Sequence, residues 1–229
     1  SSVKDPVRDA EVNLIGLLRV LEGARKAKTR KVIFASSGGT IYGEPDASLL
    51  PLDEKTTWKP LSPYGVAKLA GSLYVNAYSS LHGIKGVTLA LANVYGPRQD
   101  QNGEAGVVAI FAGSLLENRL CTIFGGGKQT RDFIYVDDVA SAFIAASEKA
   151  DAGIFNIGTG RETSILHLYE KMASFAKSDK KPEMGEARIG ELERSALDPT
   201  LAVENLGWKP STDLNLGIRK TFKWFESQI

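Results

Sequence analysis

The sequence is poor in the features that mark secreted, metal-binding and membrane-spanning proteins. A single cysteine, Cys121, among 229 residues excludes a disulfide within the chain and fits a reducing compartment such as the cytoplasm. No group of histidine, cysteine and carboxylate residues has the spacing of a zinc site. The longest apolar run, residues 107–112, is too short to span a bilayer.

Neither sign of charge is in excess. The chain has 28 basic and 27 acidic residues and a formal net charge of +1, so it lacks the basic surplus typical of proteins that bind nucleic acid or anionic membranes. Its 43% of hydrophobic and 24% of charged residues are ordinary for a soluble globular protein. A chain of this length can bury a full core and form one or two domains.

The first part of the sequence alternates between helical and strand patterns. Residues 1–9 are polar, so we expect a loop there. Helical apolar spacing and the short apolar runs of buried strands then follow in turn, at 11–27, 31–35, 62–80 and 86–93. This alternation predicts an α/β fold with a doubly wound, Rossmann-type parallel sheet. Ligands of such sheets bind at the carboxyl ends of the strands.

The composition changes after Tyr95. A polar loop over 96–106 is followed by shorter elements, with helices expected over 107–118 and 213–227 and strands over 121–125, 133–136 and 153–157. Ser164 and Asp198-Pro199 have the character of helix starts, and Asp137 or Asp138 is expected to cap another helix. The run Gly125-Gly126-Gly127 lacks the lysine–hydroxyl pair of a phosphate loop, so we interpret it as a turn.

The most informative stretch is the helix that starts at Ser62 and Pro63, an N-cap followed by a first-turn proline. On this helix Tyr64 and Lys68 lie one turn apart on one face, with Cβ atoms about 5–6 Å from each other. A phenol is a poor base at neutral pH, and a nearby ammonium lowers its pKa. We therefore predict that Tyr64 exchanges a proton with a substrate hydroxyl. The bare Tyr-x-x-x-Lys motif is weak, and its surroundings decide its meaning.

Several motifs surround this helix in a specific order. They are Phe34–Gly43 upstream and Asn93–Gln99, Arg131–Asp138, Asn156–Gly160 and Leu206–Pro210 downstream. In order and spacing they resemble the extended short-chain dehydrogenase/reductases of the NAD-dependent epimerase/dehydratase family. The resemblance covers essentially the whole chain, and it is strongest to the members that act at C4 of UDP-glucose and UDP-galactose.

This resemblance implies epimerisation at C4 of a UDP-sugar through a 4-keto intermediate, with a tightly held NAD. The resemblance implies that Tyr64 transfers the proton and that Lys68 assists it. The family often has a serine or threonine where this chain has Gly38, so the hydroxyl that bonds the sugar oxygen is expected from Ser37 or Thr40. We favour Ser37 for its location and keep Thr40 open.

The resemblance also implies two sets of ligand contacts. The cofactor contacts are Asn13, Ser36, Tyr64 and Lys68. The substrate contacts are Asn93, Thr122, Phe124, Arg131, Arg188 and Glu191. The two arginines suit a diphosphate, because a guanidinium makes planar, bidentate contacts with phosphate. Ala90 stands where relatives often have arginine, so we expect the local packing to differ.

Two domains follow from the same resemblance. Residues 1–95 would be the C-terminal part of an NAD-binding Rossmann domain, to which 133–157 returns, and 96–229 a substrate domain. The family's Gly-x-x-Gly-x-x-Gly pyrophosphate loop has no counterpart in the sequence. We therefore expect a C-terminal part of a longer protein, inactive by itself; a lineage that lost the loop is the alternative.

Other functions share the scaffold. Gly39-Thr40 stands where family 4,6-dehydratases have Asp-Glu, which argues against water loss. A 4-ketosugar reductase and a UDP-glucuronate epimerase or decarboxylase stay open, as does a non-catalytic nucleotide-binding fragment, although an intact Tyr64 and Lys68 argue against a degenerate site. Family members often pair through helices like 11–27 and 62–80, which is compatible with a homodimer.

Overall fold

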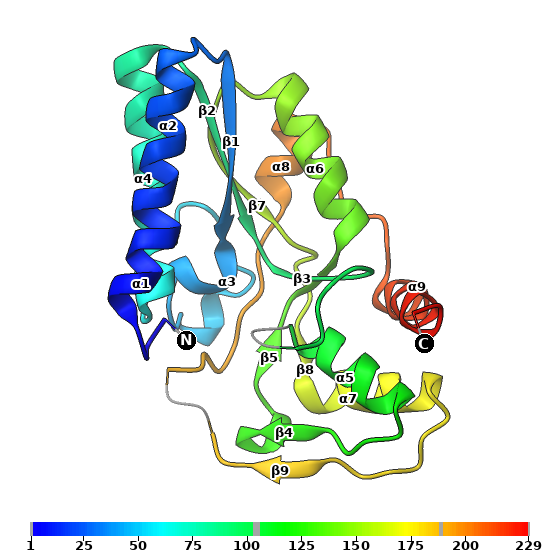
Figure 1. The fold of residues 1–229 in the computed structure, drawn as a ribbon. Coiled ribbons are helices and arrows are strands. Elements are labelled where there is room, and N and C mark those ends of the chain that lie inside the picture. Colours follow the sequence, from blue (N-terminus) through cyan, green and yellow to red (C-terminus); the bar gives the residue numbers. More distant parts are fainter. Residues whose placement is uncertain (1, 103–105, 188–189, 229) are drawn as a thin grey trace.

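The computed structural model describes residues 2–102, 106–187 and 190–228. A parallel sheet of three strands, in the order β1-β2-β7, forms the upper half of the molecule in Figure 1. The strands span Lys31–Ser37, Lys85–Leu91 and Ala152–Ile157. They pair in register, with Ser37 opposite Leu91 and Leu91 opposite Ile157. The carboxyl ends of all three strands therefore meet at one edge, as the predicted parallel α/β sheet requires.

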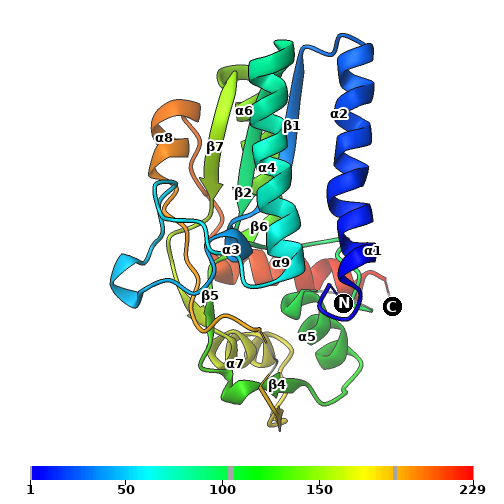
Figure 2. The same cartoon turned by 90° about the vertical axis from the view of Figure 1, so that its left-hand side faces the viewer.

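Helices cover both faces of this sheet (Figures 1 and 2). One face carries α2 (Gly16–Lys26) and α4 (Pro63–His82), and the other carries α6 (Val136–Lys149) and α8 (Thr200–Leu206). The predicted start of α4 is confirmed, because the Ser62 hydroxyl accepts a hydrogen bond from the Gly65 amide at 3.1 Å. In the described part of the chain, no helix has the length and apolar character needed to cross a membrane.

The N-terminal segment is more helical than predicted. A helix α1 (Pro6–Ala10) continues through a π-helical turn η1 (Glu11–Ile15) into α2. The expected loop is therefore wrong from Pro6 onward. Asp5 caps the helix by accepting a hydrogen bond from the Arg8 amide at 3.0 Å, and Pro6 occupies its first turn. This Asp-Pro pair is the same kind of start signal as Ser62-Pro63.

The lower half contains three small two-stranded ladders. β3 (Asn93–Tyr95) pairs with β6 (Phe133–Tyr135), β4 (Thr122–Phe124) with β9 (Glu183–Gly185), and β5 (Thr130–Arg131) with β8 (Thr163–Ser164). The predicted strand 86–93 is thus two strands. Ala92 separates them: its amide bonds to the Ile157 carbonyl, whereas the Asn93 amide turns to the Asp132 carbonyl.

Three longer helices pack in this lower half: α5 (Val107–Leu116), α7 (Ile165–Phe175) and α9 (Leu214–Glu226). The shorter helical turns are α3 (Gly38–Ile41), η2 (Ala47–Leu49) and η3 (Gly125–Gly127). The predicted turn over Gly125-Gly126-Gly127 is confirmed, since each of these glycines has a positive φ. Ser164 and Asp213 cap α7 and α9 with their side chains.

Buried apolar side chains form two clusters. One lies between the sheet and the helices α6 and α8 and includes Leu89, Ile134 and Leu197. The other lies among α5, α7 and α9 and includes Phe111 and Leu168. Adjacent residues of β6 point into different clusters, Ile134 into the first and its neighbours Phe133 and Tyr135 into the second. The alternation of side chains along a strand lets this short strand hold the two cores together.

Asp138 has a different role from the predicted helix cap. Tyr135 precedes α6 without a side-chain cap. The buried carboxylate of Asp138 instead accepts hydrogen bonds from the Ser211 hydroxyl at 2.7 Å and the Thr212 amide at 3.0 Å. The capping prediction is therefore wrong, because the carboxylate binds a segment more than seventy residues away in sequence and fixes the approach to α9.

Asp132 is the most heavily bonded buried side chain of the motif that begins at Arg131. It is 1% exposed, and its carboxylate accepts hydrogen bonds from the amides of Thr159, Gly160 and Leu197 and from the Thr159 hydroxyl. Two loops are thereby tied to the β6 ladder. A Cβ at Gly158 would lie 2.5 Å from the Asp132 carboxylate, so only glycine allows this approach.

We predict that Asp132→Ala lowers the free energy of unfolding by about 3 kcal/mol, because it leaves buried amide donors without an acceptor. Urea denaturation measures this loss. Asp137→Ala is the matched control: this exposed carboxylate in the first turn of α6 should contribute less than about 1 kcal/mol through the helix dipole. Equal midpoints for the two variants would contradict the assigned role of Asp132.

Candidate active site

The predicted pair of Tyr64 and Lys68 lies in the first two turns of α4, beside the end of β1. The Lys68 Nζ lies 5.6 Å from the centre of the Tyr64 ring and 5.0 Å from that of Phe34. It donates a hydrogen bond to the Ala35 carbonyl at 3.1 Å. The expectation that the two side chains share one face of a helix is confirmed.

The electrostatics of the pair differ from the sequence prediction. Burial raises the pKa of Tyr64, and a hydrogen bond with the Ser37 side chain opposes this shift. Burial also lowers the pKa of Lys68. The predicted low pKa of Tyr64 is therefore wrong for this structure. The ammonium is 5.6 Å from the ring centre and bonds to a backbone carbonyl, so the cost of desolvation outweighs its attraction for a phenolate.

The two candidate hydroxyls occupy different environments. The Ser37 side chain acts on the Tyr64 phenol and opposes the rise of its pKa, whereas the Thr40 hydroxyl donates to the Ser37 carbonyl at 3.2 Å. Between them, Gly38 has no room for a side chain, since a Cβ there would overlap the Leu197 side chain. The hydroxyl next to Tyr64 therefore comes from Ser37, and the packing of Leu197 explains the glycine at 38.

Two predicted cofactor residues have partners within the protein. Ser36 is 3% exposed; its hydroxyl donates to the Lys68 carbonyl at 3.2 Å and accepts from the Ser72 hydroxyl at 3.0 Å. These bonds hold β1 against α4. Asn13 lies in the π-helical turn and donates from Nδ2 to the Asp9 carboxylate at 3.0 Å. Ser36 thus positions Lys68 through the hydrogen bond to its backbone carbonyl.

A cavity of about 500 Å³ brings most of the predicted substrate residues together. Those that line it are Asn93, Thr122, Phe124, Arg131 and Glu191. The sixth, Arg188, lies outside the described residues. The other walls are mainly apolar and come from α5, through Val107, Ile110 and Phe111, and from Leu120 and Ile165.

Arg131 is fixed in the wall of this cavity. Its side chain is 12% exposed, and its Nη2 lies 3.3 Å from the Glu191 carboxylate, while Nη1 donates to the Thr130 carbonyl at 2.7 Å. Burial lowers the pKa of the guanidinium, and Glu191 opposes this shift. An arginine held in this way suits an anionic group such as a phosphate.

The chain segment that carries Glu191 is held by contacts with distant parts of the chain. The Glu193 amide donates to the Glu44 carboxylate at 2.8 Å, and its carbonyl accepts from the Thr130 amide at 2.8 Å. The adjacent Arg194 forms an ion pair with Glu162. None of these three contacts follows from local sequence, because each joins segments at least thirty residues apart.

Gln129 is a cavity residue that the sequence did not suggest. Its Nε2 donates to the Phe124 carbonyl at 2.9 Å. Its Oε1 is buried and, within the described residues, has no hydrogen-bond partner. The indication in the sequence is that Gln129 lies two residues before Arg131, directly before the strand β5.

Asn93 links the cavity to the Tyr64 pair. It lines the cavity, and its Oδ1 lies 3.4 Å from where a Cβ at Gly39 would be. Gly39 follows Ser37 by two residues, so the amide of Asn93 lies between the hydroxyl beside Tyr64 and the chamber that contains Arg131. The predicted proton-transfer residues and the predicted anion contact therefore lie on adjoining segments of the structure.

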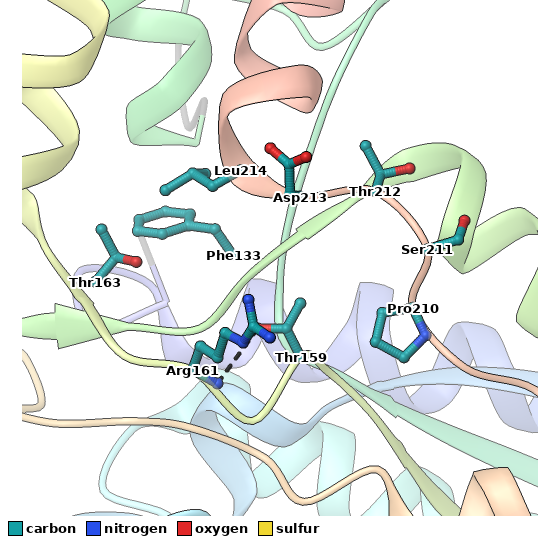
Figure 3. Close-up of a pocket in the computed structure, with 9 residues that line it drawn as sticks. All are labelled: Phe133, Thr159, Arg161, Thr163, Pro210, Ser211, Thr212, Asp213 and Leu214. Carbon is teal, nitrogen blue, oxygen red and sulfur yellow. Dashed lines mark hydrogen bonds between the residues drawn. The ribbon is translucent and has the colours of Figure 1, made fainter.

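A second cavity, of about 260 Å³, has a different lining (Figure 3). Its walls are the loop from Thr159 to Thr163 and the segment from Pro210 to Leu214, with Phe133 beside them. The Arg161 amide donates to the Thr159 hydroxyl at 3.3 Å, shown as the dashed line. Among the described residues, none that is predicted to bind substrate or cofactor lines this cavity.

Comparison with known proteins adds independent evidence. Residues 1–158 match the model of the NAD dependent epimerase/dehydratase family. A UDP-glucose 4-epimerase from Mycolicibacterium smegmatis is 47% identical over 228 residues, which cover 99% of this chain and 72% of that protein. At this identity and coverage, the chain and this relative are members of one family.

Two solved structures have the same fold. The UDP-glucose 4-epimerase of Thermotoga maritima, solved with UDP-glucose, has a TM-score of 0.97 at 44% identity, over 99% of this chain and 73% of that one. The UDP-glucose 4-epimerase of Thermus thermophilus, solved in complex with NAD, has a TM-score of 0.92 at 40% identity, over 100% of this chain and 74% of that one. The chain therefore belongs to the NAD dependent epimerase/dehydratase family.

Proposed function

We propose that this protein interconverts UDP-glucose and UDP-galactose by epimerisation at C4, through a 4-keto sugar and with NAD as cofactor. The observation that carries the proposal is a cavity of about 500 Å³ that contains Arg131 and Asn93. Asn93 also lies beside Gly39, close in sequence to Ser37, which supports a single site that includes Tyr64 and Lys68. The similarity to two UDP-glucose 4-epimerases, one solved with UDP-glucose and the other with NAD, supports it.

Tyr64 is the proposed proton-transfer residue. Its raised pKa keeps the phenol protonated near neutral pH, so in this state it donates a hydrogen bond to the sugar O4. Ser37, whose side chain acts on the same phenol, is the proposed second contact to that oxygen. Removal of the proton from the C4 hydroxyl requires the phenolate form of Tyr64. We therefore expect turnover to rise with pH as the fraction of phenolate increases.

The residues present fit NAD. The Lys68 ammonium uses a donor on the Ala35 carbonyl and keeps others for hydroxyl groups of a ligand. Tyr64 and Lys68 would hold the cofactor, with Asn13 at the adjoining helical turn and Ser36 behind Lys68. When bound, NAD supplies hydride transfer at C4.

We propose that the nucleotide end of the substrate binds in the cavity lined by Arg131 and Glu191. Arg131 is the proposed contact to the diphosphate, with Arg188 as the second, and Glu191 is placed to accept hydrogen bonds from ribose hydroxyls. Thr122 and Phe124 line the proposed base pocket. The apolar wall from α5 suits the face of a base.

We further propose the division into two domains, with residues 1–95 and 133–157 in the cofactor domain and the rest of 96–229 in the substrate domain. The two separate apolar clusters support this division in part: Leu197 and the helix α8, which lie within 96–229, pack with the cluster of the sheet. We also propose a homodimer in the cytoplasm. Apolar side chains exposed on the outer surface of η1, α2 and α4, among them Val12, Val20, Val66 and Leu73, support pairing through these helices.

Tyr64→Phe removes the phenol oxygen while keeping the ring, so we predict a loss of turnover of about 10²–10⁴-fold with an unchanged circular dichroism spectrum. The assay is conversion of UDP-galactose to UDP-glucose with NAD supplied. Tyr74→Phe, on the exposed side of the same helix, is the control and should keep full turnover. Near-native turnover in Tyr64→Phe would remove Tyr64 from its assigned role.

Arg131→Ala is expected to weaken UDP binding by roughly 1.5–3 kcal/mol, the scale of a hydrogen bond to a charged group. Titration calorimetry with UDP measures the change. Arg161→Ala in the second cavity is the matched control and should leave the affinity unaltered. The reverse result, with binding lost in the Arg161 variant alone, would move the diphosphate to the cavity in Figure 3.

A further inference from the structure

Glu44 bonds to the chain segment that carries Glu191. Its Oε2 accepts a hydrogen bond from the Glu193 amide at 2.8 Å, and its Oε1 accepts one from the Arg194 amide at 3.4 Å. Glu44 and Glu193 are 149 residues apart in the sequence. A charged acceptor makes such bonds stronger than a neutral one does. One side chain thus holds two consecutive amides of a distant segment.

The backbone that leads to Glu44 is firmly held. It follows α3, which begins where β1 ends (Figure 1). Tyr42 is 2% exposed and donates a hydrogen bond to the Asn156 Oδ1 at 2.8 Å. Gly43 has a φ of 70°, and a Cβ there would overlap the Lys59 carbonyl, so this position needs glycine. Glu44 therefore extends from a fixed point of the fold.

The segment 191–195 runs from the cavity to the turn after β1. At one end, Glu191 lines the cavity and lies 3.3 Å from the Arg131 Nη2. At the other end, Ser195 is 4% exposed, and its Oγ lies 3.9 Å from where a Cβ at Gly39 would be. A displacement of this segment would therefore move Glu191 relative to Arg131.

Two further contacts hold the same segment. The Thr130 amide donates to the Glu193 carbonyl at 2.8 Å, and the Arg194 Nε donates to the Glu162 carboxylate at 2.9 Å. These contacts join the segment to β5 and to the residue before β8. Glu44 adds the connection to the residues that follow α3.

We propose that Glu44 is a positioning residue, which fixes the segment 191–195 and thereby holds Glu191 against Arg131 at the nucleotide end of the cavity. This rests on the proposed function, in which Glu191 and Arg131 contact UDP. Binding groups that are already in place cost less to order when the ligand arrives. We therefore expect Glu44 to strengthen UDP binding through this segment.

The charge of Glu44 should have the opposite effect on UDP. Its carboxylate acts on the Arg131 guanidinium and opposes the lowering of the Arg131 pKa by burial, and the same negative charge repels a diphosphate nearby. Glu44→Ala removes both the charge and the hydrogen bonds. Glu44→Gln removes the charge but keeps an oxygen that can accept from the Glu193 amide.

Titration calorimetry with UDP measures the balance. We expect Glu44→Ala to weaken UDP binding by about tenfold, the effect of losing one hydrogen bond to a charged group, and Glu44→Gln to bind with close to native affinity. Asp46→Ala is the matched control, because this exposed carboxylate of the same loop accepts from the Ser48 amide at 2.9 Å. It should leave the affinity unchanged. Unchanged or tighter binding in Glu44→Ala would overturn the proposal.

A double variant shows whether Glu44 acts through Glu191. Once Glu191→Ala has removed the side chain that Glu44 positions, adding Glu44→Ala should cause little further loss of UDP affinity. A tenfold loss in both backgrounds would overturn the proposal. Turnover gives a related readout: Glu44→Ala should raise the KM for UDP-galactose and keep kcat near native, because Tyr64 is untouched. An unchanged KM with a lowered kcat would contradict the assigned role.

The contact itself can be followed without a ligand. In ¹H–¹⁵N NMR spectra of the protein, the amide protons of Glu193 and Arg194 should move upfield in Glu44→Ala, which removes their acceptor, and stay in place in Asp46→Ala. Unmoved signals in Glu44→Ala would overturn the proposal. Shifted signals in a protein that binds no UDP would instead reject the proposed function and confine Glu44 to holding the segment.

Discussion

The site depends on the burial of a lysine and a tyrosine in the seam between β1 and α4. This seam is closed by polar and apolar contacts together. The Ser36 and Ser72 hydroxyls bond to each other and to the Lys68 carbonyl. A Cβ at Gly71 would lie 2.8 Å from the Phe34 ring, so glycine lets that ring reach the helix. The close approach fixes Lys68 over Phe34 and removes water from its ammonium.

The same burial determines the chemistry available to Tyr64. A solvated phenol beside a lysine would have a lowered pKa, but the desolvated one in this seam has a raised pKa. Tyr64 therefore holds its proton in the ligand-free state, although its interaction with the Ser37 side chain opposes the effect of burial. Asp132 supports the cavity that contains Arg131, because its backbone carbonyl binds the amide of the cavity residue Asn93 and its side chain holds two loops.

Sequence reasoning succeeded where local signals decide the structure. The start of α4 needs only Ser62 and Pro63, and the end of α8 needs only Gly207, which adopts a positive φ of 59°. The gathering of Asn93, Arg131 and Glu191 around one cavity was expected from the family resemblance, not from spacing. The extra helix before residue 11 could have been predicted, since Asp5-Pro6 is the same signal.

The misses have a common physical origin in contacts between distant segments. Asp138 turned from its own helix to Ser211, and Leu197 occupied the space beside Gly38. The pKa of Tyr64 depends on its burial in the fold, which a four-residue spacing cannot report.

The most direct test of the central claim is the fate of a label at C4. UDP-galactose deuterated at C4 would be incubated with the protein and NAD, and the products analysed by NMR and mass spectrometry. The account predicts UDP-glucose that retains deuterium at C4, because hydrogen leaves and returns to the same carbon within one closed site. UDP-glucose that has lost the deuterium at C4, or a product that has lost water, would contradict it.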